Sequence, residues 1–333
     1  MTGTLATNPA PRTANLLVRA CLSEYLVLLL VLLYFAVLLP FTPGFASREN
    51  LGNLVATLLP LFVVAMGQTL VLITGGIDLS VTSIMALTSV TGAMVMTSDN
   101  GWLAGSPLAV PAGLLVMLLF GAAVGLVNGV AVTALRMPPF IVTLATMMFF
   151  SGLAIWLTKS KTIYNLPAAF NALGGKTWLA FLVTGLCAGI THLLLGRSLL
   201  GRWLYAVGHN ARAALISGVP VAGVIVAAYV ASGLLAAVAS VLYTGQAETG
   251  SPVLGQRLLL DIIGATVIGG TSLFGGRGRV VWTLFGVLFI KLIDNSLNLL
   301  NLSLFSVTMV KGGVILFAAL VDALRIRFLS ANP

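Results

Sequence analysis

The side chains of this chain that could do chemistry are few, and most of the charged ones lie in apolar surroundings. Asp78, Asp261, Asp294, Lys291 and Lys311 fall within or beside long apolar runs. A charge in a membrane-spanning segment is costly, so it usually marks an ion or substrate path or pairs with another charge. One hypothesis from these five residues is therefore a secondary transporter, in which they bind a coupling ion or a proton.

Two of these charges are predicted to pair. The last two apolar runs are joined by a short turn centred between Leu302 and Ser303. In an antiparallel hairpin, Asp294 and Lys311 lie equally far from that turn, roughly 12–13 Å deep at a rise of about 1.5 Å per residue. Pairing offsets part of a burial cost of at least about 3 kcal/mol for each charge. Lys291, one helical turn from Asp294, competes for the same carboxylate, and the alternative for Lys311 is a polar pathway or a dimer contact.

Other reactive side chains are too sparse for catalysis. His192 and His209 have no carboxylate at ligand spacing, and Cys21 and Cys187 lie far apart in the chain. These spacings predict no metal site, no acid–base pair and no disulfide framework.

Two glycine-rich segments resemble nucleotide-binding loops only superficially. GGKT at 174–177 lacks the earlier glycine of a phosphate-binding loop, because position 170 is Phe, and no strand precedes it. GGRGR at 275–279 lacks dinucleotide-fingerprint spacing. We therefore predict no cofactor and no catalytic residue, so energy for any transport must come from a partner or an ion gradient.

The composition indicates an integral membrane protein. Hydrophobic residues make up 59% of the chain and charged residues only 8%, against about 25% charged in soluble domains. The formal charge of +9 is carried by single basic residues at the ends of apolar runs. They therefore indicate membrane topology rather than binding to nucleic acid.

Ten apolar runs predict an all-α polytopic protein, since a crossing needs about 20 apolar residues. The runs are Leu26–Pro40, Leu51–Ile73, Val81–Met96, Leu108–Leu135, Phe140–Leu157, Trp178–Leu195, Val221–Tyr243, Leu258–Leu273, Val281–Leu300 and Leu304–Leu320. Their lengths leave open whether the third and eighth cross completely. We expect tails at 1–20 and 324–333 around a membrane domain at 21–323, with an uncleaved first span because no convincing cleavage site follows the tail.

The positions of arginine and lysine set the expected orientation. Basic residues are retained on the cytoplasmic side, and a cytoplasmic N-terminus with ten spans places ten of them there against five outside. The cytoplasmic ten are Arg12, Arg19, Arg136, Arg197, Arg202, Arg212, Arg277, Arg279, Arg325 and Arg327. The outer five are Arg48, Lys159, Lys161, Lys176 and Arg257. Both termini are therefore predicted to be cytoplasmic.

Glycine-rich breaks interrupt both halves of the apolar pattern, TGGIDLS at 74–80 and IGGTSLFGGRGR at 268–279. Paired breaks are typical of transporters built from two pseudo-repeated halves, although glycine is also frequent wherever membrane helices pack closely. In the first break, Gly75, Gly76 and Asp78 form a structural motif. We expect Asp78 to cap the next helix by accepting backbone N–H groups, rather than to contact a substrate.

The long interruption at 196–220 carries three arginines and a run of small residues. An ordinary charged loop that only fixes topology is one interpretation. The small side chains favour another, a short helix over Ala211–Ser217 that lies parallel to the membrane and docks in a partner's groove.

These segments together resemble the permease subunits of ribose-type (monosaccharide) ABC importers. The resemblance lies in GQTLVLITGGIDLSV at 67–81, PPFIVTLATM at 138–147, GRWLYAVGHNARAALISGVPV at 201–221 and LDIIGATVIGGTSLFGGRGRVVWTLFGVL at 260–288. It implies a homodimer in a bacterial inner membrane, with an ABC ATPase subunit below and a periplasmic sugar-binding protein above. It also implies that the segment 196–220 couples the permease to the ATPase. The coupling residues would be Gly208, Asn210, Ala213, Ala214, Ser217 and Gly218, with His209 standing where the family commonly has glycine.

A path for a neutral sugar is expected to offer amides and hydroxyls rather than charges. The candidates are Gln68, Thr69, Asn128, Thr143, Thr146 and Asn298, although packing between helices is the commoner role for each residue alone. The resemblance does not name the sugar. A permease for branched-chain amino acids or another small polar solute is the alternative within the same class, and the secondary transporter is the alternative outside it.

Overall fold

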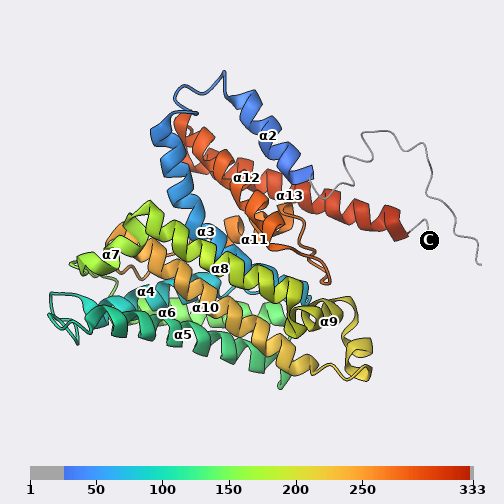
Figure 1. Ribbon diagram of the computed structural model, residues 1–333, viewed down its shortest axis with the longest axis horizontal. Helices are drawn as coiled ribbons and strands as arrows, with labels where there is room; N and C mark the ends of the chain where they lie inside the picture. Colours follow the sequence, from blue (N-terminus) through green and yellow to red (C-terminus); the bar gives the residue numbers. More distant parts are fainter. Residues whose placement is uncertain (1–25, 331–333) are drawn as a thin grey trace, which may run out of the picture.

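The computed structural model describes residues 26–330, which form twelve helices and no strand. They are α2 Leu26–Leu38, α3 Arg48–Ile73, α4 Val81–Met96, α5 Ala109–Thr133, α6 Pro139–Thr158, α7 Ala168–Gly175, α8 Thr177–Arg197, α9 Leu199–Ile216, α10 Val221–Ala247, α11 Leu259–Ile268, α12 Val280–Leu299 and α13 Leu304–Ser330. Figure 1 shows α5, α6, α8 and α10 running along the long axis, with α2, α3 and α12 inclined to them.

Each of the ten predicted apolar runs contains a helix or most of one, and the run Val81–Met96 has the bounds of α4. Six helices, α3, α5, α6, α8, α10 and α12, are long and apolar enough to cross a membrane. The apolar parts of α2, α4, α11 and α13 are shorter. The prediction of an all-α, multi-pass membrane protein is therefore confirmed for the part of the chain that the structure describes.

One helix was not predicted, and another is longer than predicted. The predicted polar loop 158–177 contains α7, and the predicted short helix in the central segment is the second part of the longer α9. The helix α13 continues to Ser330, so most of the predicted tail 324–333 is helical. The predicted tail 1–20, with Arg12, Arg19 and the neighbouring Cys21, lies outside the described residues.

The helices α3, α4 and α10 form the centre of the bundle. Of the 16 residues of α4, all but Met94 are buried, because α5, α6 and α10 surround it. Glycines bring α5 close to α10: a Cβ added at Gly121 would lie 2.5 Å from the Gly233 carbonyl oxygen. One turn further, a Cβ at Gly125 would collide with the Tyr229 backbone. Such seams of small residues are a common basis of helix packing in membranes.

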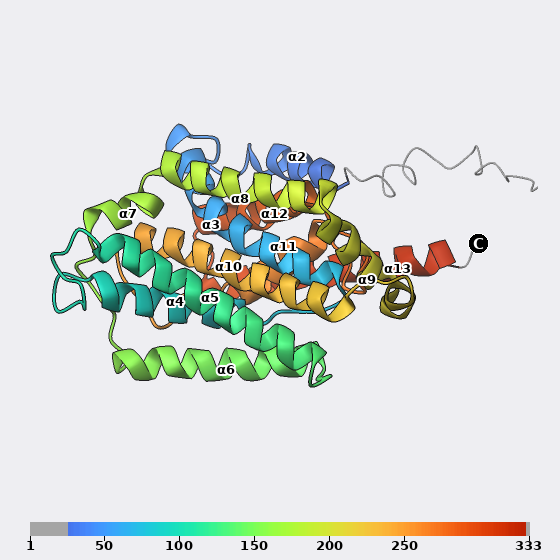
Figure 2. The ribbon, with the colours of Figure 1, turned by 60° about the horizontal axis from the view of Figure 1, so that its bottom comes forward.

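The two ends of the bundle differ in chemistry. Figures 1 and 2 show α9 at one end and α7 at the other, with α8 and α10 running between them. At the α7 end, Trp102, Trp156 and Trp178 are 74%, 74% and 63% exposed. Exposed tryptophans at helix ends are typical of the membrane–water boundary.

Candidate functional site

The three interruptions of the apolar pattern meet at the α9 end of the molecule (Figure 1). The Gly276 N–H donates a hydrogen bond to the Ile73 carbonyl oxygen at 2.9 Å. A Cβ added at Gly275 would lie 2.9 Å from the Gly208 carbonyl oxygen and 3.0 Å from the Gly75 nitrogen. We call Gly75, Gly208, Gly275 and Gly276 the glycine junction. Segments separated by some 200 positions in the sequence thus form one contact.

Gly75 also ends α3. Its φ of +80° is a left-handed conformation that glycine adopts at little cost. The Gly75 N–H donates to Leu72 O at 2.9 Å, and the Gly76 N–H donates to Val71 O at 3.2 Å. These two bonds form a Schellman motif, which satisfies carbonyl groups that the end of a helix would otherwise leave unpaired. The predicted structural role of the two glycines therefore has a clear geometric basis.

The helix α9 changes direction at Asn210, whose φ of −162° and ψ of 98° are extended. The Asn210 Oδ1 atom accepts a hydrogen bond from the Ala213 N–H at 3.0 Å, so it caps a new helix. That helix covers 211–216, with Ser217 as its C-cap and Gly218 next at a φ of +82°. The short helix predicted over Ala211–Ser217 is confirmed to within one residue.

The side chains of this short helix divide between two environments. Ala214 is only 5% exposed and belongs to the hydrophobic core. Ala213 and Arg212 are exposed, and Leu215 and Ile216 are 62% and 83% exposed. The Ala213 side chain is therefore accessible to a partner protein. The Ala214 side chain packs in the hydrophobic core and is not accessible to one. The predicted coupling set treated the two alanines as equivalent, and the structure separates them.

Asp78 follows the first break and is fully buried. Its Oδ1 atom accepts from the Ser80 N–H at 3.0 Å and from the Ser80 hydroxyl at 2.6 Å. Ser80 is the N-cap residue of α4, whose first turn has no side-chain cap. Asp78 accepts a backbone N–H directly before the helix, as expected, but it does not cap the helix itself. Its Oδ2 atom accepts from the Ser232 hydroxyl at 2.9 Å. That contact fixes the break to α10, and nothing local in the sequence indicated it.

Three predicted pathway residues extend the same hydrogen-bond network. The Asn128 amide of α5 donates to the Ser80 hydroxyl at 2.8 Å and accepts from the Thr146 hydroxyl of α6 at 2.8 Å. Thr143 donates to the Ile77 carbonyl oxygen at 3.3 Å. Their polar groups join α4, α5 and α6 in this state, which is the packing role rather than substrate contact.

The remaining pathway candidates have different surroundings. The Thr69 hydroxyl lies 2.7 Å from that of Thr283 on α12, and Asn298 is exposed near the end of α12. Gln68 is fully buried, yet neither its amide nitrogen nor its amide oxygen has a hydrogen-bond partner. A buried amide without a partner is rare and calls for an explanation.

Four charged side chains meet between α11, α12 and α13. The Lys311 ammonium lies 3.1 Å from an Asp294 oxygen, so the predicted pair is confirmed, and it lies 2.9 Å from an Asp261 oxygen. The Lys291 ammonium is 3.7 Å from Asp294. We call these four residues the charge cluster. Among the described residues, no three or more His, Cys, Asp and Glu side chains are placed to hold a metal ion.

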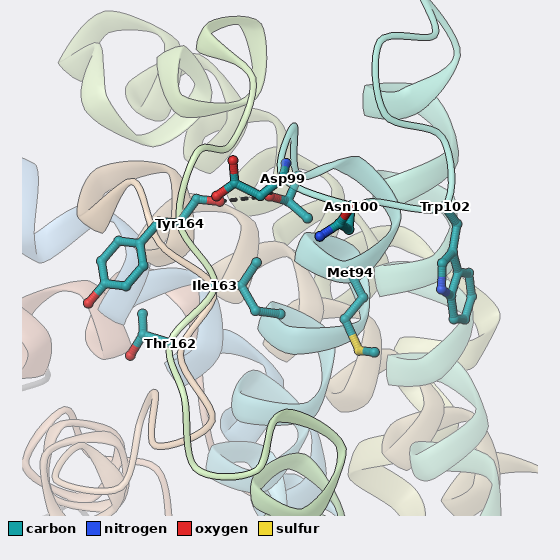
Figure 3. Close-up of a pocket in the computed structure, with 8 residues that line it drawn as sticks. Met94, Asp99, Asn100, Trp102, Thr162, Ile163 and Tyr164 are labelled. Carbon is teal, nitrogen blue, oxygen red and sulfur yellow. Dashed lines mark hydrogen bonds between the residues drawn. The ribbon is translucent and has the colours of Figure 1, made fainter.

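A small open cavity of about 280 Å³ lies at the α7 end. Its lining includes Trp102 and Tyr164, whose ring types suit sugar stacking, but Figure 3 shows them pointing away from one another with Ile163 and Met94 between them. The Thr97 hydroxyl donates to the Tyr164 carbonyl oxygen at 2.8 Å and fixes the loop. The rings cannot clamp a sugar in this arrangement.

Comparison with known proteins gives matches along nearly the whole chain. A family described as "Branched-chain amino acid transport system / permease component" matches residues 50–319. The chain is 39% identical over 308 residues to the ribose import permease protein RbsC of Bacillus subtilis (strain 168), covering 90% of this chain and 92% of that protein. It is 35% identical over 317 residues to RbsC of Escherichia coli (strain K12), covering 91% and 95%. It is 34% identical over 304 residues to the L-arabinose transport system permease protein AraH of the same strain, covering 90% of each. No solved structure matches.

Proposed function

Because this chain belongs to the family of branched-chain amino acid transport system permease components, we propose that it is the permease subunit of an ATP-driven importer of a monosaccharide. The observation that carries the proposal is the similarity to permeases named for ribose and L-arabinose over about nine tenths of the chain. The protein lies in the bacterial inner membrane. An ABC ATPase subunit supplies the ATP hydrolysis, and a periplasmic binding protein delivers the sugar.

The exposed face of the short helix 211–216 is the docking site for the ATPase subunit. Leu215 and Ile216 are exposed at a helix that is neither long nor apolar enough to cross the membrane. Apolar side chains displayed in this way mark interaction sites. Through the glycine junction, α9 contacts both the end of α3 and the loop that precedes α12. Movement of the docked helix would therefore displace these membrane helices directly.

The α9 end is cytoplasmic and the α7 end is periplasmic. Arg136 lies between α5 and α6, Arg197 is the last residue of α8, and Arg212 lies in α9. Arginine is retained on the cytoplasmic side of a membrane. All ten apolar helices enter the membrane, and α4 and α11 are too short to cross it fully at about 1.5 Å per residue. Both termini are cytoplasmic under this arrangement.

A second copy of the chain covers the face that carries the charge cluster. The Asp294 side chain is 25% exposed and that of Lys311 is 14% exposed, although they lie roughly 12–13 Å from the membrane surface at 1.5 Å per residue. Lipid is a poor solvent for charges at that depth. A homodimer with a polar path between its subunits gives these groups water or protein instead.

The test is reconstitution of the permease with its ATPase subunit and sugar-binding protein in proteoliposomes. Sugar-loaded binding protein is expected to stimulate ATP hydrolysis and sugar uptake. The variant Ala213→Trp should abolish this stimulation while the permease still inserts, and Ala213→Ser, which keeps the side chain small, should retain it. Full coupling in Ala213→Trp would refute the docking face.

The second candidate function is import of branched-chain amino acids, which the printed description of the matching family favours. The same proteoliposome assay separates the two candidates if binding proteins loaded with ribose, L-arabinose, galactose or leucine are compared. Uptake that follows a proton or sodium gradient without ATP would refute both and favour the secondary transporter.

A further inference from the structure

The chain between α10 and α11 does not stay at the α7 end of the molecule. It turns back at Gly250, which pairs with Ile163 in a short antiparallel bridge. From there, residues 251–258 continue as turns and not as a helix. We call residues 251–258 the descending segment. Its contacts with α4 show how far it runs back into the molecule.

Two glycines mark the course of this part of the chain along α4. A Cβ added at Gly250 would collide with the side chain of Ala93, near the end of α4. A Cβ added at Gly255 would lie 3.3 Å from the Thr82 carbonyl oxygen and 3.4 Å from the Met85 sulfur, near the start of α4. These two places on α4 are roughly 12–16 Å apart at about 1.5 Å per residue. The descending segment therefore covers most of the length of α4.

Hydrogen bonds fix the same levels. The Ser251 N–H donates to the Ser89 hydroxyl at 3.1 Å, and the Ser240 hydroxyl of α10 donates to the Met85 carbonyl oxygen at 2.8 Å. Beyond the descending segment, α11 has 10 residues, or about 15 Å of helix, and it leads to the loop 269–279 at the glycine junction. Figure 1 shows α11 in the middle of the molecule. The descending segment thus ends about halfway between the α7 end and the α9 end.

The end of the descending segment is polar and exposed on the single chain. Gln256 and Arg257 are both exposed, and among the described residues Arg257 takes part in none of the ion pairs. Non-helical backbone at membrane depth is tolerated only where protein buries it or where it lines a water-filled cavity. A charge at that depth has the same requirement. Lipid is therefore a poor neighbour for this part of the surface.

The charge cluster continues this polar surface. Asp261 follows Arg257 by about one helical turn, and its carboxylate lies 2.9 Å from the Lys311 ammonium. The Asp294 side chain, which also contacts Lys311, is 25% exposed. Donors and acceptors of both signs thus occur along the chain from the descending segment into α11. Such a surface suits water and neutral polar molecules.

We propose that Gln256 and Arg257 line a water-filled passage at the middle of the membrane and donate hydrogen bonds to the hydroxyl groups of the monosaccharide that crosses it. The proposal rests on the proposed function for the class of substrate. Segments where a membrane helix is interrupted commonly form the substrate sites of transporters, and guanidinium and amide groups together offer a polyol several donors and one acceptor. The proposal places Arg257 inside the membrane and not among the outer basic residues that the sequence predicts.

The first experiment measures water access in proteoliposomes. Arg257→Cys and Gln256→Cys are made in a background in which Cys21 and Cys187 are replaced by Ser, and a charged thiol reagent is supplied on both sides of the membrane. Both introduced cysteines should react about tenfold faster or more than Phe149→Cys, the control on α6, which is 65% exposed on an apolar helix, because reactive thiolates form in water. Equal rates would overturn the proposal. So would an unreactive Arg257→Cys that instead forms a disulfide with a second copy, since that result assigns the surface to the dimer contact.

The second experiment measures sugar uptake per ATP hydrolysed. Arg257→Leu should lower this ratio roughly tenfold, because a hydrogen bond from a charged donor is lost, and Gln256→Leu should lower it by less. Arg257→Lys should restore part of the loss, since an ammonium group also donates. The matched control is Lys161→Leu, which removes an exposed cation of the loop before α7 and should keep the parental ratio. Thermal unfolding of Arg257→Leu should match the parent, and a parental uptake ratio in this variant would refute the contact with sugar.

The two proposals fail in different ways. Sugar uptake by the parent with slow labelling at position 257 would refute the water-filled passage alone. Rapid labelling in a parent that imports leucine and not sugar would refute the proposed function and would assign Arg257 to the carboxylate of an amino acid.

Discussion

The change Gly208→Ala tests whether the glycine junction transmits movement. A Cβ at residue 208 would overlap the Ile73 carbonyl oxygen and lie 2.5 Å from the Gly276 nitrogen. Real Cβ atoms essentially never approach within 3.0 Å of such atoms. Both neighbours are backbone, so no side chain can swing aside and the junction must open. The hydrogen bond from Gly276 to Ile73 spans the gap that the methyl group would enter.

The expected change in the free energy of unfolding is the sum of two destabilising contributions and one stabilising contribution. Overpacking a tight contact costs about 1–3 kcal/mol, and losing the Gly276–Ile73 hydrogen bond costs about 1 kcal/mol. Replacing glycine by alanine inside a helix returns up to about 1 kcal/mol. The free energy of unfolding should therefore fall by about 1–3 kcal/mol. The coupling of ATP hydrolysis to sugar should fall further, because α9 no longer rests on α3.

The assay compares Gly208→Ala with Gly223→Ala, in which a Cβ would meet no atom within 4 Å. Thermal unfolding in detergent reports stability, and sugar-stimulated ATP hydrolysis in nanodiscs reports coupling. The Gly223→Ala variant should match the parent or be slightly more stable. A Gly208→Ala protein with parental stability and coupling would show that the junction is neither tight nor part of transmission.

Three further changes test the buried polar groups. Lys311→Met should lower the free energy of unfolding by about 3–5 kcal/mol, because it leaves the carboxylates of the charge cluster without their cation. Lys291→Met removes only a 3.7 Å contact with Asp294, so it should lower the free energy of unfolding by less. Equal decreases in the two variants would contradict the central role of Lys311 in the charge cluster. Asp78→Asn should fold and transport nearly normally, since the amide oxygen can still accept both bonds from Ser80. Asp78→Ala should lower the free energy of unfolding by about 1–3 kcal/mol, and a folded but inactive Asp78→Asn would indicate a role for the charge. Gln68→Leu should raise stability by about 1–3 kcal/mol by removing an unpartnered amide. Reduced sugar uptake in that stabilised variant would assign the amide to the path, and unchanged uptake would exclude it.

The sequence predicted the helices well because long apolar runs and polar breaks leave the backbone few choices in a membrane. The exceptions are the first part of α9 and the whole of α7, an eight-residue helix in a segment with several lysines. Its Phe170 and Gly174 are buried, and a Cβ at Gly174 would collide with the Leu242 carbonyl group of α10. A tertiary contact fixes this helix, and eight residues are too few for an apolar period to reveal it.

The site was predictable only where its geometry is local. Asp294 and Lys311 could be matched because a short hairpin gives equal depth to residues equally far from its turn. Asp261 belongs to α11, whose position against α13 follows from the fold of the whole chain. The buried position of Ala214 was equally hidden, because the bend at Asn210 resets the helical phase. A run of small residues cannot show which of them faces the core.

The loop at 269–279 connects the glycine junction to the charge cluster mechanically. It follows the end of α11 and precedes the start of α12, and each of these helices carries one of the two carboxylates that Lys311 contacts. Asp261 lies seven residues before the end of α11, so the cluster begins roughly 10 Å from the loop at 1.5 Å per residue. Contiguity alone does not prove coupling. The loop joins α11 directly to α12, and Lys311 of α13 contacts a carboxylate on each of these two helices. We therefore expect a displacement at α9 to act on the contacts of Lys311 with Asp261 and Asp294, because these ion pairs link α11 and α12 to α13.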